Sequence, residues 1–278
     1  MGWHAKLALD YRFDPQRQRT VARSSHSGPL RVLQSLYPEG DAVCHNVLIH
    51  PPGGLVGGDV LDIELHAGAS SHALVTTPGA TRFYRTEGQV AVQRTHLVLE
   101  PGARLDWLPL EAICFNACRA ENHLRIDLAP GAQMLGWDVI ALGLPGAGQA
   151  FEAGSLLQHI EMPGIWLERG RIDATDTRLL ESPLGLAGQR SLATLFLLSG
   201  EPLPPTQRDA LLDSARALCD ASPLQGSSGA TSPHAQVVVL RALAPVVEPA
   251  MNLLREVWQA WRAQLWQMPR GMPRIWAT

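Results

Sequence analysis

The residues best suited to chemistry in this 278-residue chain lie in one irregular segment, His50–Asp59, which reads HPPGGLVGGD. Two prolines and four glycines in ten residues exclude a regular helix or strand and require a specific irregular backbone. The imidazole at one end and the carboxylate at the other could coordinate a borderline divalent cation. From these residues alone, an elaborate turn between two strands remains the simpler interpretation.

The cysteines raise the question of a second kind of metal site. Cys114 and Cys118 are followed by His123, and Cys44-His45 could supply further ligands, which together resemble half of a zinc site. Their spacing is not that of a standard ligand pair, and free cysteines usually pack as small hydrophobic residues. We favour the packing role and leave open whether Cys114 and Cys118 bind metal.

The common catalytic motifs do not occur in the sequence. The glycine-rich segment lacks the Lys-Ser/Thr pair of a phosphate-binding loop, and neither His-Glu-x-x-His nor Gly-x-Ser-x-Gly is found. Catalytic groups can nevertheless meet in space without a motif. A β-rich hydrolase or isomerase with a site built from His50, Asp59 and Glu111 is therefore the alternative hypothesis.

Composition excludes several classes of protein. Hydrophobic residues make up 46% and charged residues 18%, which favours a folded core over disorder. The net charge is −3 and the basic residues are scattered, which argues against nucleic-acid binding. The absence of a long apolar run or a signal segment predicts no membrane span, and four cysteines without such a segment predict reduced thiols and a cytoplasmic location.

Most of the secondary structure around these residues is expected to be β-strand. Val60–His66 alternates apolar and polar residues with period two, and turn signals such as Pro101-Gly102 and Pro130-Gly131 separate the candidate strands. Strands so short and so evenly punctuated favour antiparallel sheets. Further strands are expected at His72–Thr77, Val90–Leu99, Leu105–Leu108, His123–Leu128, Met134–Leu142 and Ser191–Leu198.

A faint internal repeat accompanies the strands. His96–Trp107 is echoed by His123–Trp137, and Gly-Ala pairs start at positions 68, 102 and 131. The unequal intervals argue against a strict solenoid and favour hairpin-like units stacked in layers over a shared core.

The last third of the chain adds helices. Thr206 is a candidate cap for a first helix, a Gly/Ser-rich loop over Gln225–Ser232 precedes a strand over Ala235–Ala242, and an amphipathic helix starts near Pro249. Trp258 and Trp261 lie on its apolar face, where a core role is the simpler one. We therefore predict a mainly β protein. It is one β-rich domain over 1–278, with layered antiparallel strands over 1–200 and about two helices in 201–278.

Several motifs, taken in order, resemble the urease accessory protein UreD family, also called UreH. The resemblance runs from end to end. It is carried by Gly28-Pro29-Leu30, Leu36–Gly40, His50–Asp59, Thr76–Arg85, Trp107–Glu111, Gly136-Trp137-Asp138 and Pro273–Thr278. The chain departs from the family's usual residues at Arg82, Leu110, Asp138, Leu144 and Gln149, and the loss of a polar group puts any role of 110, 144 and 149 in doubt.

The resemblance implies a maturation factor that is not an enzyme. Such proteins bind the urease apoprotein, form a complex with UreF and, through it, with the GTPase UreG, and support nickel insertion, in some accounts through an internal passage. Nickel would then be transient cargo, and no cofactor would be tightly bound. Because nickel must both bind and leave, dispersed oxygen and imidazole ligands suit the path better than thiolates.

Candidate ligands and a candidate interface follow from this implied role. Asp59 and Asp138 come first, because each is a carboxylate in apolar, glycine-rich surroundings. For Glu64, on the polar side of a strand, a solvated position is the stronger interpretation. Glu168 and His50 complete the metal candidates. The C-terminal segment around Arg274 and Trp276 is expected either to dock in the fold or to face UreF.

Overall fold

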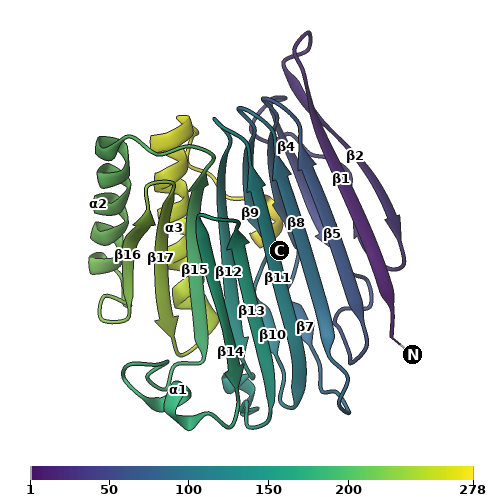
Figure 1. The fold of residues 1–278 in the computed structure, drawn as a ribbon, viewed down its shortest axis with the longest axis vertical. Helices are drawn as coiled ribbons and strands as arrows, with labels where there is room; N and C mark the ends of the chain where they lie inside the picture. Colours follow the sequence, from purple (N-terminus) through teal and green to yellow (C-terminus); the bar gives the residue numbers. More distant parts are fainter. Residues whose placement is uncertain (1, 278) are drawn as a thin grey trace.

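The computed structural model describes residues 2–277 and is built mainly of strands (Figure 1). Within these residues the strands form two sheets. In order across sheet A, they are β14 (Trp166–Asp173), β13 (Gly154–Met162), β11 (Cys118–Leu128), β8 (Ala91–Leu99), β5 (Val60–Ala67), β1 (His4–Asp14) and β2 (Arg19–Ser27).

Sheet B faces sheet A and is larger. Its main path runs β16 (Ser228–His234), β17 (Val237–Ala244), β15 (Ser191–Ser199), β12 (Gln133–Leu142), β9 (Arg104–Leu108), β6 (His72–Thr76), β4 (Val43–Ile49) and β3 (Arg31–Val32). Two short strands lie off this path, β10 (Ala112–Cys114) beside β12 and β7 (Thr81–Phe83) beside β10. The mainly β prediction is confirmed.

The prediction of antiparallel strands is wrong for the middle of both sheets. β5, β8, β11 and β13 pair in parallel, and so do β4, β6, β9 and β12. Antiparallel pairs join β1 to β2, β3 to β4, β13 to β14, β12 to β15, β15 to β17 and β16 to β17. The chain passes from a strand of sheet A to one of sheet B and back, so successive coils place strands of the same direction side by side. A solenoid coil and a β-hairpin have strands of the same length and the same turn residues. The sequence pattern therefore could not distinguish parallel from antiparallel neighbours.

The internal repeat marks these coils. Each Gly-Ala pair lies at the turn from sheet A to sheet B, after β5, β8 and β11 in turn. Gly102 and Gly131 have positive φ angles of 72° and 76°, which a glycine adopts without strain. In the pairing of β8 with β11, Ala91 faces Ala120, and this register equals the interval between those two glycines. The stacked-hairpin interpretation is therefore replaced by a solenoid-like one.

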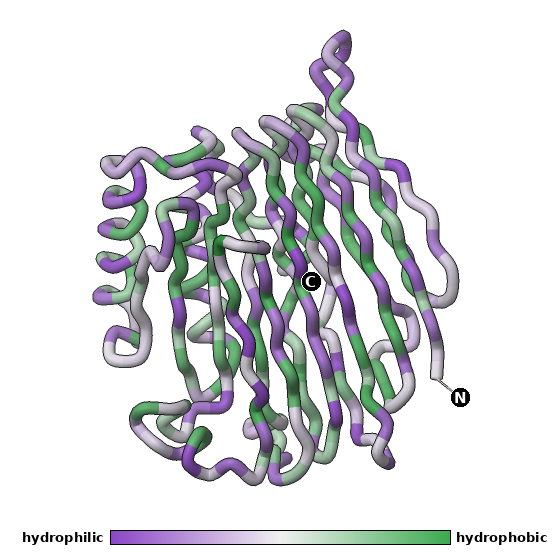
Figure 2. The backbone as a smooth tube through the Cα atoms, in the orientation of Figure 1, coloured by the Kyte–Doolittle hydropathy of each residue, from purple (hydrophilic) through white to green (hydrophobic). Residues whose placement is uncertain are grey.

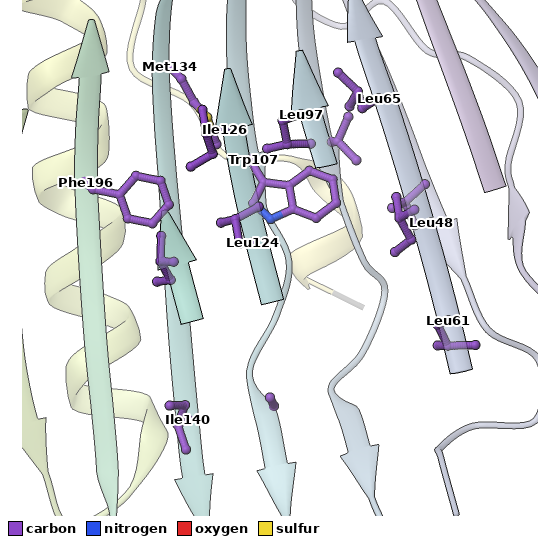
Figure 3. Close-up of a cluster of buried hydrophobic side chains, with 14 of the residues drawn as sticks. Leu48, Leu61, Leu65, Leu97, Trp107, Leu124, Ile126, Met134, Ile140 and Phe196 are labelled. Carbon is purple, nitrogen blue, oxygen red and sulfur yellow. The ribbon is translucent and has the colours of Figure 1, made fainter. Parts of the chain in front are cut away.

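Two hydrophobic cores hold the layers together. The larger fills the space between the sheets and contains Leu97, Trp107 and Phe196 (Figure 3). Along the strands apolar and polar residues alternate, so that sheet A turns a polar face outward (Figure 2). The outer face of sheet B is covered by α2 (Pro205–Ala221) and α3 (Val247–Trp266), which form the second core with it.

The helical third corrects some boundaries. Trp258 and Trp261 are buried in the second core, as the spacing predicted. α2 starts after Pro204 and lacks a side-chain cap in the described residues, so Thr206 is not the cap. The expected loop at Gln225–Ser232 already contains the start of β16. A short α1 (Thr177–Glu181) and two 3-10 turns, Pro145–Ala147 and Arg274–Ala277, complete the elements. Across residues 2–277 no helix is both long and apolar enough to cross a membrane.

Candidate functional site

Polar side chains form a row in the otherwise apolar space between the sheets. On β11 the side chains of Ala120, Leu124 and Ile126 point into the core, and Asn122 shares their face because side chains alternate along a strand. Asn122 lies opposite Gln93 of β8 on one side and Gln158 of β13 on the other. These three amides and Asp138 of sheet B are called the polar row here.

Hydrogen bonds connect part of the polar row across the two sheets. The Gln93 side-chain amide donates to Asn122 Oδ1 at 3.3 Å, and the Asn122 amide donates to Asp138 Oδ1 at 3.2 Å. Both polar atoms of the Gln158 side chain are buried without a hydrogen-bond partner in the described part of the chain. Unpaired polar groups in a core are costly, so this row lowers stability and needs a reason to exist.

Asp138 is the charged member of the row. Burial raises the pKa of its carboxyl group from the ordinary 3.8 to about 7, and nearby Glu168 acts in the same direction. The Gln158 amide is near enough to oppose this shift, although its geometry falls short of a hydrogen bond. The carboxyl group therefore exchanges its proton near neutral pH. A divalent cation that binds there would displace this proton, because a carboxylate ligand must be ionised.

One end of the polar row opens at the edges of the sheets. Glu168 of β14 points inward with Trp166 and Ile172, and Arg241 of β17 follows the inward-facing Val239. Arg241 Nη2 lies 2.5 Å from Glu168 Oε2, so this ion pair links the edge of sheet A to sheet B. Both side chains are partly exposed to solvent.

The other end of the row reaches a cavity. A pocket of about 340 Å³ is lined by apolar side chains such as Leu48, Leu61 and Trp107, together with Gln93 and His50. Both ring nitrogens of His50 are buried without a hydrogen-bond partner within residues 2–277. Burial lowers the pKa of His50, with Asp59 opposing this shift, so the imidazole is neutral at pH 7 and has a free lone pair.

Asp59 and Glu64 lie apart from the polar row. The Asp59 carboxylate is buried and accepts hydrogen bonds from the backbone N–H of Trp3 at 2.7 Å and of Val56 at 2.8 Å. It therefore clamps the glycine-rich loop to the N-terminal strand. Glu64 is exposed on the outer face of sheet A. Of the five predicted metal ligands, only Asp138, Glu168 and His50 lie between the sheets.

The other candidate residues do not form a compact site. Glu111 lies near Arg255 of α3, whose pKa it raises against the larger effect of burial, and so faces the helical layer. Cys114 and Cys118 are free and fully buried in the core between the sheets. No group of three or more His, Cys, Asp or Glu side chains in the described range could hold a metal ion.

The C-terminal segment docks against the fold. The ring of Trp276 lies 5.3 Å from that of Trp137 and 5.7 Å from that of Trp258, and its Nε1–H donates to Thr76 Oγ1 at 2.8 Å. Arg274 remains exposed beside a small pocket. The segment was expected either to dock in the fold or to face UreF. Trp276 docks in the fold. Thr278 lies outside the described residues.

Sequence reasoning missed Gln93, Asn122, Gln158 and Arg241. A signal existed for Asn122, because a polar residue stands at a position where the alternation of β11 requires an apolar one. The other three become conspicuous only when strand register places them beside Asn122 or Glu168.

By its fold, the chain is a two-layered, solenoid-like β protein with a polar row in its core. Its sequence matches the family described as "UreD urease accessory protein" over residues 4–277. It is 67% identical to the urease accessory protein UreD of Variovorax paradoxus (strain S110), and 61% and 58% identical to those of Polaromonas sp. (strain JS666) and Leptothrix cholodnii. Each of these alignments covers the whole of both chains. The chain belongs to the UreD family of urease accessory proteins.

Membership in this family tests the alternative hypothesis of an enzyme. The family consists of accessory proteins of urease maturation and not of enzymes. The hypothesis of a hydrolase or isomerase at His50, Asp59 and Glu111 is therefore wrong.

Proposed function

We propose that this protein carries nickel between its two sheets to the urease apoprotein, as one part of a complex with UreF and, through UreF, with UreG. The observation that supports it is the polar row, which extends from the His50 pocket through Asn122 and Asp138 toward the Glu168–Arg241 pair. Nickel is transient cargo in this proposal, and no cofactor stays bound.

The physical requirement is that a dication in a protein core keeps oxygen or nitrogen ligands throughout. A bare divalent ion in a medium of low dielectric constant is prohibitively unstable. Amide oxygens and a single carboxylate, met one or two at a time together with water, hold the ion without trapping it. A closed cage of thiolates would bind too firmly to release it.

Each residue of the path has a distinct role. The neutral imidazole of His50 offers a nitrogen ligand in the pocket. Asp138 supplies the negative charge at the centre, and its raised pKa lets a proton replace the departing metal. Glu168 is the last carboxylate, and the guanidinium of Arg241 holds it until nickel or a partner displaces the arginine. Asp59 supports the loop, and Glu64 has no part in the path.

The test is the nickel content of urease matured with an Asp138→Asn variant. Asparagine keeps the shape and the hydrogen bond with Asn122 but removes the charge. We expect severalfold less nickel per urease active site, while co-purification with UreF, UreG and urease is unchanged. Glu64→Gln is the matched control, since it neutralises a carboxylate on the outer face of sheet A. Full nickel loading by the Asp138 variant in an assembled complex would refute the proposal.

A further inference from the structure

A second pocket, separate from the polar row, lies where the C-terminal segment crosses the helical layer. It has a volume of about 210 Å³. Its walls come from the segment before β4, from β4 and β6 of sheet B, from α3 and from the residues that follow α3. They are Pro38, Glu39, His45, Leu74, Trp258, Arg262 and Pro269–Arg274. None of these residues lines the nickel path proposed above.

The pocket contains a buried arginine that is only partly satisfied. Arg262 is 1% exposed. Its Nη1 and Nη2 donate to Glu39 at 2.7 and 3.0 Å, and Nη2 lies 3.2 Å from Asp106 Oδ2. Its Nε–H is buried and has no hydrogen-bond partner among residues 2–277. A desolvated donor of a charged group costs free energy until an acceptor reaches it.

The charges around the pocket favour an anionic acceptor. Three arginines, Arg262, Arg270 and Arg274, line it against one carboxylate, Glu39. Both oxygens of Glu39 are already engaged, by Arg262 and by His45 Nε2 at 2.7 Å. Asp106, below Arg262, is held by Trp258 Nε1 at 2.7 Å and by His72 Nε2 at 3.3 Å. The exposed Arg270 and Arg274 thus leave the mouth positively charged.

The remaining walls are apolar. Leu74, Trp258 and Pro273 line the interior, and Met272 at the mouth is 56% exposed. Leu36, whose backbone pairs with that of the lining residue His45, is exposed to the same extent. Apolar walls around a few fixed polar groups are typical of a binding site, and exposed apolar side chains beside it extend the surface that a partner could cover.

We propose that this pocket binds an acidic side chain, flanked by apolar residues, from a partner protein. The carboxylate accepts from Arg262 Nε–H and lies between Arg270 and Arg274, and the apolar neighbours pack on Met272 and Leu36. The partner contact expected around Arg274 would thus be an ion pair with an acidic side chain. This inference does not depend on nickel transfer.

The experiment uses the full chain with 15N-labelled arginine. The probe is N-acetyl-Leu-Glu-Leu-amide, added at millimolar concentrations while the Nε–H resonance of Arg262 is followed by NMR. We expect a saturable shift, and at least tenfold weaker binding of the Leu-Gln-Leu analogue, which has the same shape without the charge. We expect the double variant Arg270→Glu/Arg274→Glu to bind the acidic probe at least fivefold more weakly.

The matched control is Arg169→Glu/Arg171→Glu, which changes the same charge on the exposed edge strand β14. It should bind the probe as the unmodified protein does. No saturable shift, equal binding of the Leu-Gln-Leu analogue, or unchanged binding by the Arg270/Arg274 variant would overturn the proposal. Displacement of the probe by equimolar inorganic phosphate would also overturn it, because the pocket would then be a general anion site.

Discussion

Replacing Asp138 by asparagine should make this protein more stable while impairing its function. The carboxyl group lies between the sheets, and burial raises its pKa from 3.8 to about 7. In the unfolded chain the pKa returns to its ordinary value. Above pH 7 the folded protein therefore contains a carboxylate that would be better solvated after unfolding, whereas asparagine has no charge to desolvate.

The pKa shift gives the size and the sign of the effect. One pKa unit corresponds to about 1.4 kcal/mol. The full shift therefore limits the gain in the free energy of unfolding from Asp138→Asn to about 4 kcal/mol. Because part of Asp138 remains exposed to solvent, we expect the substitution to raise the free energy of unfolding by about 2–3 kcal/mol. The folded-state pKa is the higher one, so stability is highest below the unfolded pKa and falls as pH rises to about 7. The advantage of the asparagine should therefore vanish near pH 4 and be complete at pH 8.

The assay is thermal unfolding of both proteins at pH 4, 6 and 8. At pH 8 the variant should melt about 5–10 °C higher, and the difference should shrink steadily toward pH 4. Asp213→Asn, on the exposed face of α2, is the control and should change little at any pH. A variant that is less stable at pH 8, or a gain that does not depend on pH, would refute the account of Asp138.

Three further predictions concern the framework. Gly58 has a φ of 91°, so Gly58→Val should lower the free energy of unfolding by about 1–3 kcal/mol, and a denaturant midpoint equal to that of the unmodified protein would contradict this. Arg262→Met leaves the buried carboxylates of Glu39 and Asp106 without their cation, so urea titration at pH 7 should reveal a loss of about 3–5 kcal/mol; a neutral effect would mean that the ion pairs are dispensable. His45 and Arg262 lower the pKa of Glu39 to about 2 despite its burial, so its contribution is complete above pH 4.5 and is lost as pH falls toward 2; Glu39→Gln should flatten the acid part of the stability curve, and an unchanged curve would exclude that role.

Local patterns were enough to predict most strands but not their directions. The alternation in Val60–His66 predicted β5, and the spacing of Trp258 and Trp261 predicted the buried face of α3. Both signals depend only on neighbours in the sequence. Whether β5 continues into a hairpin or a coil depends on which sheet receives the next strand, and the turn after Ala67 does not encode this.

The candidate site was predicted only in part for the same reason. Asp59 and Asp138 gave the same signal, a carboxylate among apolar and glycine residues. One is satisfied by backbone N–H groups from Trp3 and Val56, and the other faces a row of amides. Only the register of strands far apart in the sequence shows that Asp59 holds a loop in place and that Asp138 is the candidate ligand. The contact of Arg262 with Glu39 joins the last helix to the segment before β4 and leaves no trace in local sequence.

The most direct test of nickel passage between the sheets compares two neighbouring residues of β11. Asn122 points into the polar row, and His123 points outward from sheet A, where its ring lies 5.6 Å from that of His159. The measurement is nickel per active site in urease matured with Asn122→Leu or with His123→Leu, after assembly of the complex has been verified. We expect severalfold less nickel with Asn122→Leu, because leucine interrupts the row of oxygen ligands, and normal loading with His123→Leu. Normal loading with Asn122→Leu, or a loss only with His123→Leu, would contradict passage between the sheets.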